Sequence, residues 1–216
     1  MAEKLTQKTV EGLLTDFASD SPAPGGGSAA ALTGALAASL CEMVARLTLG
    51  REKLKEAWPA MERVLAKAQH LGIRLRELVD EDTEAYASVV TARRLPKDAS
   101  GEKAVRDRAI QESLLRAARV PLETLRSLAE LSGLALLVAE KGAQGCITDA
   151  GAAAVMIEAG AQAAAWNVRI NLPGIRDAAV KDQLGRDATA ALALALETAA
   201  RIRPIVDTKL SERRGT

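Results

Sequence analysis

A carboxylate within an apolar helical face is the clearest sign of chemistry in this chain of 216 residues. Asp82 lies between Val79 and Tyr86, in a run of apolar positions separated by alternating steps of four and three residues. This spacing is typical of one buried face of a helix. Burying an unpaired carboxylate is costly. We therefore expect Asp82 either to form a salt bridge with an arginine of another helix or to serve a reaction from a partly dry site.

A glycine loop is the second candidate. The segment Ser21-Pro22-Ala23-Pro24-Gly25-Gly26-Gly27-Ser28 precedes a run of small apolar residues. The prolines hold the chain extended, the glycines widen its backbone freedom, and Ser28 is predicted to be the N-cap of the following helix. Such a loop presents backbone N–H groups to an anion or a polar ring, although the loop taken alone favours a tight turn between two packed helices. No Gly-Lys-Ser/Thr follows and no strand precedes, which excludes the common nucleotide-binding loops.

A second stripe of four-three steps carries polar residues towards both of its ends. It begins at Asp149, passes through small residues and ends with Asn167 and Ile170. Asn167 and Asn171 lie one helical turn apart, and each can donate and accept hydrogen bonds. Asp149 suits a helix cap as well as it suits a second carboxylate of a site.

The elements that must position these residues are all helical. Alternation with a period of two is nearly absent, and alanine, leucine, glutamate, lysine and arginine dominate. The sequence predicts an all-α fold, a bundle of about five to six long helices in a single domain over residues 1–216. We expect helices at about 4–18, 28–49, 51–94, 100–140, 148–171 and 177–210, with a kink or break at Val120-Pro121.

Composition excludes several classes of function. The formal net charge is +1 and aromatic residues are 2% of the chain, which argues against nucleic-acid binding. Two cysteines and one histidine cannot build a disulfide framework or a four-ligand metal site. The N-terminus lacks a secretion signal, and Glu42 and Arg46 interrupt the only stretch long enough to span a membrane. We expect a cytoplasmic protein with no metal and no membrane partner.

Small-residue faces indicate tight helix contacts. Gly34 and Ala38 are spaced by four in one predicted helix, and Gly160 and Ala163 by three in another. Such faces permit close backbone approach within or between chains. They favour a dimer in which helices pack closely.

Three motifs together resemble the formiminotetrahydrofolate cyclodeaminase and methenyltetrahydrofolate cyclohydrolase family, and the match covers nearly the whole chain. They are Pro22-Ala23-Pro24-Gly25-Gly26-Gly27-Ser28, then Asp82-Thr83-Glu84-Ala85-Tyr86 with Leu95-Pro96-Lys97, then Ile147-Thr148-Asp149-Ala150-Gly151 with Asn167-Val168-Arg169-Ile170-Asn171. The resemblance implies an all-α homodimer and a metal-free reaction, without a further cofactor, on a one-carbon unit between N5 and N10 of tetrahydrofolate. Arg46 and residues 51–54 depart from the family's pattern, so they would alter substrate preference if they contact folate.

The resemblance also implies roles for the candidate residues. Asp82 is expected to stabilise the methenyl cation, with Asp149 as the second choice of carboxylate. The expected substrate-binding residues are Pro24, Gly25, Gly26, Gly27, Ser28, Tyr86, Lys97, Lys141, Asn167 and Asn171. The two lysines would meet glutamyl carboxylates or a developing oxyanion, unless they are simply solvated.

Three functions remain open. The favoured one is hydrolysis of 5,10-methenyltetrahydrofolate, because the chain shows no partner domain that would deliver a formimino substrate. The first alternative is a cyclodeaminase that closes the formimino compound and releases ammonia. The second is a non-catalytic helical scaffold.

Overall fold

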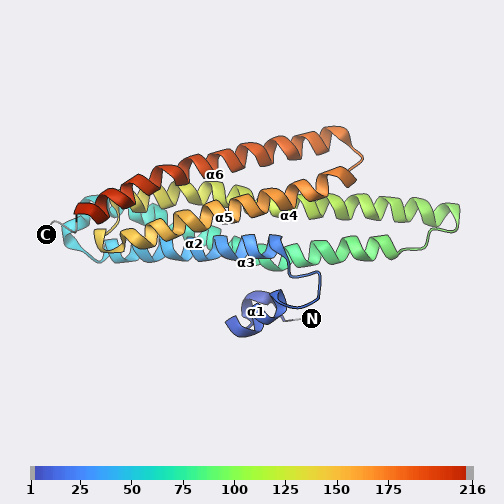
Figure 1. Ribbon diagram of the computed structural model, residues 1–216, viewed down its shortest axis with the longest axis horizontal. Coiled ribbons are helices and arrows are strands. Elements are labelled where there is room, and N and C mark those ends of the chain that lie inside the picture. The colour runs from blue at the N-terminus through green and yellow to red at the C-terminus, as the bar shows by residue number, and fades with distance from the viewer. Residues whose placement is uncertain (1–2, 213–216) are drawn as a thin grey trace.

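The computed structural model describes residues 3–212, apart from the side chain of Ser100. Its described part is a single all-α domain, as the sequence predicts. The α-helices are α1 (Val10–Phe17), α2 (Gly26–Leu49), α3 (Trp58–Arg94), α4 (Ser100–Lys141), α5 (Ile147–Asn171) and α6 (Ala178–Glu212). Short 3-10 helices cover Leu5–Gln7, Glu52–Ala57, Gln144–Cys146 and Leu172–Gly174. Helices α2 to α6 run along the long axis of the molecule, and α1 lies to one side of them (Figure 1).

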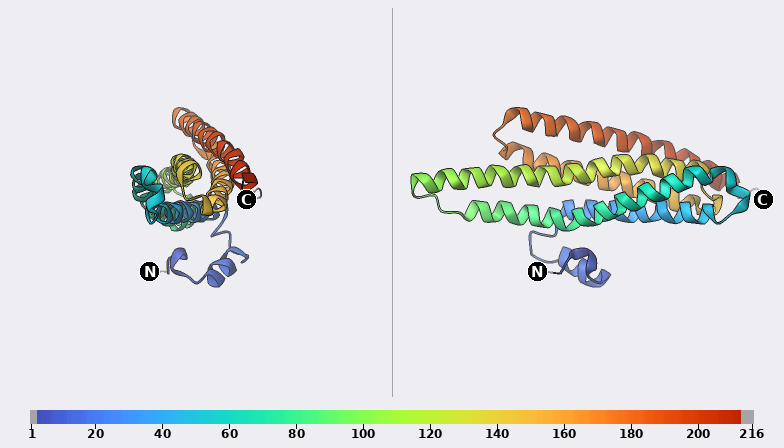
Figure 2. Two further views of the ribbon diagram at one scale, coloured as in Figure 1. Left: turned by 90° about the vertical axis from the view of Figure 1, so that its left-hand side faces the viewer. Right: turned by 180° about the vertical axis from the view of Figure 1, so that it is seen from behind.

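The core is built around α2, α4 and α5. Helix α2 packs against α3 and α5, and α4 packs against α3, α5 and α6; the end-on view in Figure 2 shows this arrangement. Leucines such as Leu75, Leu125 and Leu128 are fully buried between these helices. Helix α2 is long and apolar enough to cross a membrane by length and composition, but 56% of its most apolar window is buried inside the protein. The expectation of a core helix agrees with this packing.

The small-residue faces are used within the chain. A Cβ added to Gly34 would lie 2.9 Å from Leu128 and 3.0 Å from Leu75, and a Cβ added to Gly160 would lie 3.2 Å from the carbonyl oxygen of Ala30. Both glycines therefore let neighbouring helices of the same chain approach closely. They do not supply a surface for a second copy.

The N-terminal region differs from the predicted single helix. Leu5–Gln7 and α1 are separate pieces, and the side chain of Thr9 accepts a hydrogen bond from the backbone N–H of Gly12 at the start of α1. The N–H of Leu5 donates to Asp80 Oδ1 at 2.7 Å, which holds the segment against α3. Val10 and Leu14, predicted as part of the apolar side, are 75% and 61% exposed.

Two predicted helix caps are wrong. Helix α2 begins at Gly26 with Gly25 as its N-cap, so Ser28 lies inside the first turn. Helix α5 begins at Ile147 with Cys146 as its N-cap, so Asp149 also lies inside a first turn and caps nothing. In both places the chain enters the helix without a side-chain cap, which leaves the side chains of Ser28 and Asp149 free for other contacts.

Pro121 does not break α4, which continues through it. A proline inside a helix has no N–H to give to the carbonyl four residues earlier, and here that carbonyl belongs to Ala117. Asn171 of α5 supplies the missing donor, because its Nδ2 donates to the carbonyl oxygen of Ala117 at 3.1 Å. The tertiary hydrogen bond compensates for the one that the proline removes.

Candidate functional site

A cavity of about 380 Å³ lies where the glycine loop meets α3, α4 and α5. We call it the glycine-loop cavity. Its polar side chains are those of Asp82, Tyr86, Arg93, Asn167 and Asn171. The remaining lining residues are apolar or glycine: Pro22, Ala23, Gly25, Gly26, Gly27, Ala85, Val89, Leu114, Ala117 and Ile170. A concave site with an apolar surface and a few converging polar groups is the usual form of a small-molecule site.

Asp82 is half-buried and faces the N-terminus of α2. The hydroxyl of Ser28, which is fully buried, donates to Asp82 Oδ2 at 3.1 Å. The hydroxyl of Thr83 lies 3.2 Å from that of Ser28; because a serine has one proton to give, Thr83 is the donor of this second bond when Ser28 donates to Asp82. The three side chains form a short hydrogen-bonded chain that fixes the carboxylate.

Burial raises the pKa of Asp82 above the ordinary carboxyl value of 3.8, and hydrogen bonds from the hydroxyl and backbone N–H of Ser28 oppose this rise without cancelling it. The proton affinity of Asp82 is therefore higher than that of an exposed aspartate. A carboxyl group adjusted in this direction suits proton transfer near neutral pH.

Gly26 and Gly27 leave room for two polar side chains of the cavity, those of Asn167 and Asp82. A Cβ added to Gly27 would overlap the carboxyl group of Asp82, and a Cβ added to Gly26 would lie 3.2 Å from Asn167 Nδ2. The N-terminus of α2 is a natural anion site, and here the anion beside it is the chain's own Asp82. The N–H groups of Gly26 and Gly27 form no hydrogen bond with the described residues, so they remain available to a ligand.

The alternative role of Asp82 as a structural salt bridge is not what the structure shows. Its neighbour Glu81 pairs with Arg74, which also binds Glu123 through Nε at 2.6 Å. Among residues 3–212, no lysine, arginine or histidine forms an ion pair with Asp82. Glu81 thus belongs to a salt-bridge network with Arg74, whereas the adjacent Asp82 has no counter-charge among the described residues.

Asn167 and Asn171 offer acceptors to the cavity. Nδ2 of Asn167 donates to the carbonyl of Ala163 at 2.9 Å, and Nδ2 of Asn171 donates to the carbonyls of Asn167, at 2.9 Å, and Ala117. Because a carbonyl oxygen can only accept, the amide nitrogens must face these partners. The side-chain oxygens are left for a ligand. Asn167 also keeps one N–H, because it uses only one of its two donors, whereas Asn171 uses both.

Only some of the predicted site residues meet in this cavity. Gly25, Gly26, Gly27, Asp82, Tyr86, Asn167 and Asn171 line it, and Ser28 supports it from below through Asp82. Pro24 lies in the loop without lining the cavity, and Lys97 is exposed in the turn after α3.

Asp149 and Lys141 lie at the other end of the bundle. Asp149 is in the first turn of α5, and Lys141 is the exposed last residue of α4. Eighteen residues separate Asp149 from Asn167 along α5, a distance of about 27 Å. Neither residue therefore reaches Asp82 of the same chain. The periodicity of the sequence identified the correct face of α5, but it could not show which end of that helix meets the glycine loop.

The positions that depart from the family's pattern are equally distant. Arg46 pairs with Glu42 at 3.6 Å in the last turns of α2, and residues 51–54 lie beyond the end of that helix. Arg46 is twenty residues from Gly26, about 30 Å along the helix. These departures do not change the lining of the glycine-loop cavity.

Two polar residues of the site were not singled out from the sequence. Thr83 was quoted only within a motif, and Arg93 not at all. The apolar stripe through Asp82, Tyr86 and Val89 reaches Arg93 with one more step of four, so extending the stripe would have found it. The hydroxyl contact of Thr83 depends on how α2 meets α3, and no periodicity carries that information.

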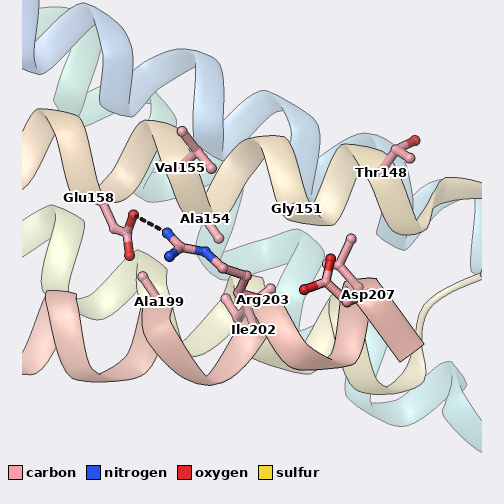
Figure 3. Close-up of a pocket in the computed structure, with 10 residues that line it drawn as sticks. Thr148, Gly151, Ala154, Val155, Glu158, Ala199, Ile202, Arg203 and Asp207 are labelled. Carbon is pink, nitrogen blue, oxygen red and sulfur yellow. Dashed lines mark hydrogen bonds and ion pairs between the residues drawn. The ribbon is translucent and has the colours of Figure 1, made fainter. Parts of the chain in front are cut away.

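A second hollow, the α5–α6 groove, differs in character. It has a volume of about 220 Å³ and is lined mainly by apolar residues. Figure 3 shows Glu158 and Arg203 meeting at one end of the groove, with Asp207 at the other. Arg203 pairs with Glu158 at 3.2 Å, and the other carboxylate of the groove, Asp207, is exposed to solvent. Asp82 of the glycine-loop cavity is instead half-buried and has no counter-charge among the described residues. In the described part of the chain, no group of three or more histidine, cysteine, aspartate or glutamate side chains could hold a metal ion.

Comparison with known proteins adds a third line of evidence. The chain is 39% identical over 204 residues to the methenyltetrahydrofolate cyclohydrolase of Methylorubrum extorquens, covering 94% of this chain and 98% of that protein. It is 35% identical to the formimidoyltransferase-cyclodeaminase of Sus scrofa, covering 84% of this chain but only 34% of that longer protein.

A solved structure matches the fold. The formiminotetrahydrofolate cyclodeaminase of Thermotoga maritima superposes with a TM-score of 0.86 at 26% identity, covering 95% of this chain and 99% of that one. Residues 9–190 also match the formiminotransferase-cyclodeaminase family as a whole. The chain therefore belongs to the formiminotransferase-cyclodeaminase family.

Proposed function

We propose that this chain is a methenyltetrahydrofolate cyclohydrolase, which converts 5,10-methenyltetrahydrofolate and water to 10-formyltetrahydrofolate. The observation that carries the proposal is Asp82, a half-buried carboxylate without a counter-charge among the described residues, at the wall of a cavity. The methenyl bridge of the substrate is a delocalised cation, which supplies the missing counter-charge. The full-length similarity to a cyclohydrolase supports the same reaction.

Asp82 would act twice in this reaction. In its ionised form it stabilises the cation and takes a proton from the water that attacks the methenyl carbon. The product of this step is a neutral carbinolamine. The protonated Asp82 then gives its proton to N5 as the bond between carbon and N5 breaks, and the carbinolamine hydroxyl loses its proton to solvent as the formyl C=O forms.

The other cavity groups would hold the pterin. The side-chain oxygens of Asn167 and Asn171 suit the amino and N3–H donors of the pterin ring, and the free N–H groups of Gly26 and Gly27 suit its carbonyl oxygen. Tyr86 supplies an aromatic face at the same wall. In the contacts of the asparagines and the glycines, the protein atom that meets the pterin has no other hydrogen-bond partner among the described residues.

The reaction is proposed to be metal-independent, because the positive charge already makes the methenyl carbon electrophilic. A metal would not be needed to activate it. We expect full activity after exhaustive treatment with a chelator. A loss of activity that added zinc or magnesium restores would contradict this part of the proposal.

Cyclodeamination is the second candidate, supported by the match to the Thermotoga cyclodeaminase. In that reaction N10 attacks the formimino carbon on N5 and ammonia leaves, so the same carboxylate could move the protons. The two reactions are separated by supplying each substrate alone to the purified protein. Loss of methenyl absorbance supports the cyclohydrolase, appearance of that absorbance with ammonia supports the cyclodeaminase, and neither change supports a scaffold.

We also propose that the protein is a homodimer that associates through the outer face of α2. Five apolar side chains follow one another on this face at steps of three and four: Leu32, Leu36, Leu40, Met43 and Leu47. None is fully buried, and Leu36 and Leu47 are 51% and 44% exposed. Sedimentation should give a dimer that Leu36→Glu dissociates, whereas Ile73→Glu, at a 52% exposed site on α3, should not. A monomeric wild-type protein would contradict the proposal.

A further inference from the structure

Arg93 is the only cation among the residues that line the glycine-loop cavity. It forms no ion pair with a carboxylate of residues 3–212, whereas Arg74, Arg116 and Arg176 each do. Its backbone is held in place, because the guanidinium of Arg106 donates to the Arg93 carbonyl oxygen at 3.1 and 3.3 Å. An exposed arginine side chain that has no carboxylate partner and lies at a cavity wall is suited to bind a carboxylate of a ligand.

The helix sets the distance between Arg93 and Asp82. Eleven residues separate them on α3, which is close to three turns, so both lie on the same face about 16 Å apart at the Cα atoms. Side chains of a helix lean towards its N-terminus, which is the direction from Arg93 towards Asp82. An arginine side chain can reach back by roughly 6 Å and the shorter aspartate by roughly 2 Å in the same direction, which leaves about 12 Å between the two charged groups.

The surface between the two charges is apolar. Val89 and the ring of Tyr86 lie between them on α3, and Leu114 and Ala117 face them from α4. Along the cavity the order is therefore a carboxylate, an apolar stretch and a guanidinium.

A folate has the complementary order. Its methenyl cation is followed by a para-substituted benzene ring and then by a glutamate with two carboxylates. From N10 to the nearer glutamate carboxylate the extended molecule spans about 10 Å by standard bond lengths. The charges and the apolar segment of the substrate thus match those of the cavity in sequence and in spacing.

We propose that Arg93 binds a glutamate carboxylate of the folate substrate and so places its one-carbon bridge against Asp82. This assignment rests on the proposed function and names a residue that fixes substrate position. Arg93 is the next-to-last residue of α3 and belongs to the cavity lining, and the end of α3 projects together with the start of α4 at one end of the molecule (Figure 1).

The test compares two substrates that differ only in the glutamate, 5,10-methenyltetrahydrofolate and 5,10-methenyltetrahydropteroate. For Arg93→Gln we expect KM for the folate to rise by roughly 10- to 100-fold, as for loss of a charge-assisted hydrogen bond, while kcat changes little. KM for the pteroate should be the same in wild type and variant. Arg94→Gln, at the exposed neighbouring residue outside the cavity, should behave as wild type towards both substrates.

Two outcomes would overturn the assignment. One is an unchanged KM for the folate in Arg93→Gln, and the other is an equal rise for both substrates, which would indicate a structural effect. Failure of the proposed function looks different, because the wild-type protein would then hydrolyse neither compound. Hydrolysis of the pteroate by the wild type establishes the reaction without involving Arg93.

Discussion

The glycine-loop cavity and the α5–α6 groove are both formed between helices, but their charged groups are arranged in opposite ways. In the α5–α6 groove, Glu158 and Arg203 neutralise each other across two helices (Figure 3), and Asp207 is exposed, so that water can solvate its charge. In the glycine-loop cavity, Asp82 has hydroxyl and backbone partners and no described cation. A paired charge at a groove is explained by packing alone, whereas a half-buried charge that is left unpaired is retained at a cost. The difference identifies the cavity, and not the groove, as the place where chemistry is expected.

The largest effect that this comparison predicts is on turnover. Asp82→Asn preserves the size of the side chain and removes its ability to carry a proton, so kcat for the methenyl substrate should fall by about 10²- to 10⁴-fold. The matched change in the groove, Asp207→Asn, should leave kcat unaltered. Steady-state assays of both variants check this, and near-normal turnover in Asp82→Asn would remove Asp82 from the mechanism.

A smaller effect is expected from filling the space beside the carboxylate. Gly27→Ala places a methyl group into the Asp82 carboxyl, so the carboxylate must shift; we expect stability to fall by about 1–3 kcal/mol and kcat/KM by about 100-fold. Gly151→Ala in the groove is the control, since its Cβ would lie 3.2 Å from a valine methyl of Val206 and should leave kcat/KM unchanged. Equal losses of kcat/KM in the two variants would contradict the specific role of Gly27 in positioning the Asp82 carboxylate.

Acidity should move activity and stability in opposite directions. The pKa of Asp82 is raised in the folded protein, so the native state binds this proton more tightly than the unfolded chain does. The contribution of Asp82 to stability is therefore greatest below its ordinary pKa of 3.8. It is lost as the pH rises through the folded-state pKa. Activity needs the ionised form and should fall as pH drops through that same folded-state pKa.

Thermal denaturation over a range of pH tests the predicted pH dependence of stability. The melting temperature of Asp82→Asn should equal that of the wild type at low pH and exceed it at higher pH. A difference between the two proteins that does not grow with pH would contradict the assigned direction of the pKa shift.

The smallest effect should come from the groove's ion pair. Arg203 is 68% exposed at its side chain, and exposed pairs contribute less than about 1 kcal/mol. Arg203→Gln should therefore change the free energy of unfolding by no more than this amount and leave kcat and KM as they are. Loss of folate binding in this variant would mean that the groove, too, belongs to the site.

Much of the fold was predictable because periodicity reports burial directly. The predicted ranges 100–140, 148–171 and 177–210 agree with the observed α4, α5 and α6 within two residues at each end, whereas the helix predicted from residue 51 begins only at Trp58, after a 3-10 segment. The stripe through Asp82 was also predictable, since a helix repeats its faces every three to four residues. Local signals were less reliable at Ser28 and Asp149, where a residue type that often caps a helix was placed inside the first turn.

What the sequence could not provide was the pairing of helix ends. Asp149 and Asn167 lie on one stripe of α5, yet only the end with Asn167 meets the glycine loop. Arg93 lies one step of four beyond Val89 on the same stripe, and it was missed because the stripe was followed only through its apolar positions. Contacts such as that between Ser28 and Thr83 arise from the crossing of two helices, which no pattern within one helix describes.

The hydrogen bond from Asn171 to Ala117 makes Pro121 a remote determinant of the binding surface. Pro121 contributes no atom to the cavity lining, yet the carbonyl that it leaves without a helical donor is what anchors the Asn171 amide. Replacing this proline with alanine would restore the N–H inside α4 and give Asn171 a competitor for its anchor. Ligand affinity could thus be tuned from within the backbone of a neighbouring helix, without touching any residue that meets the ligand.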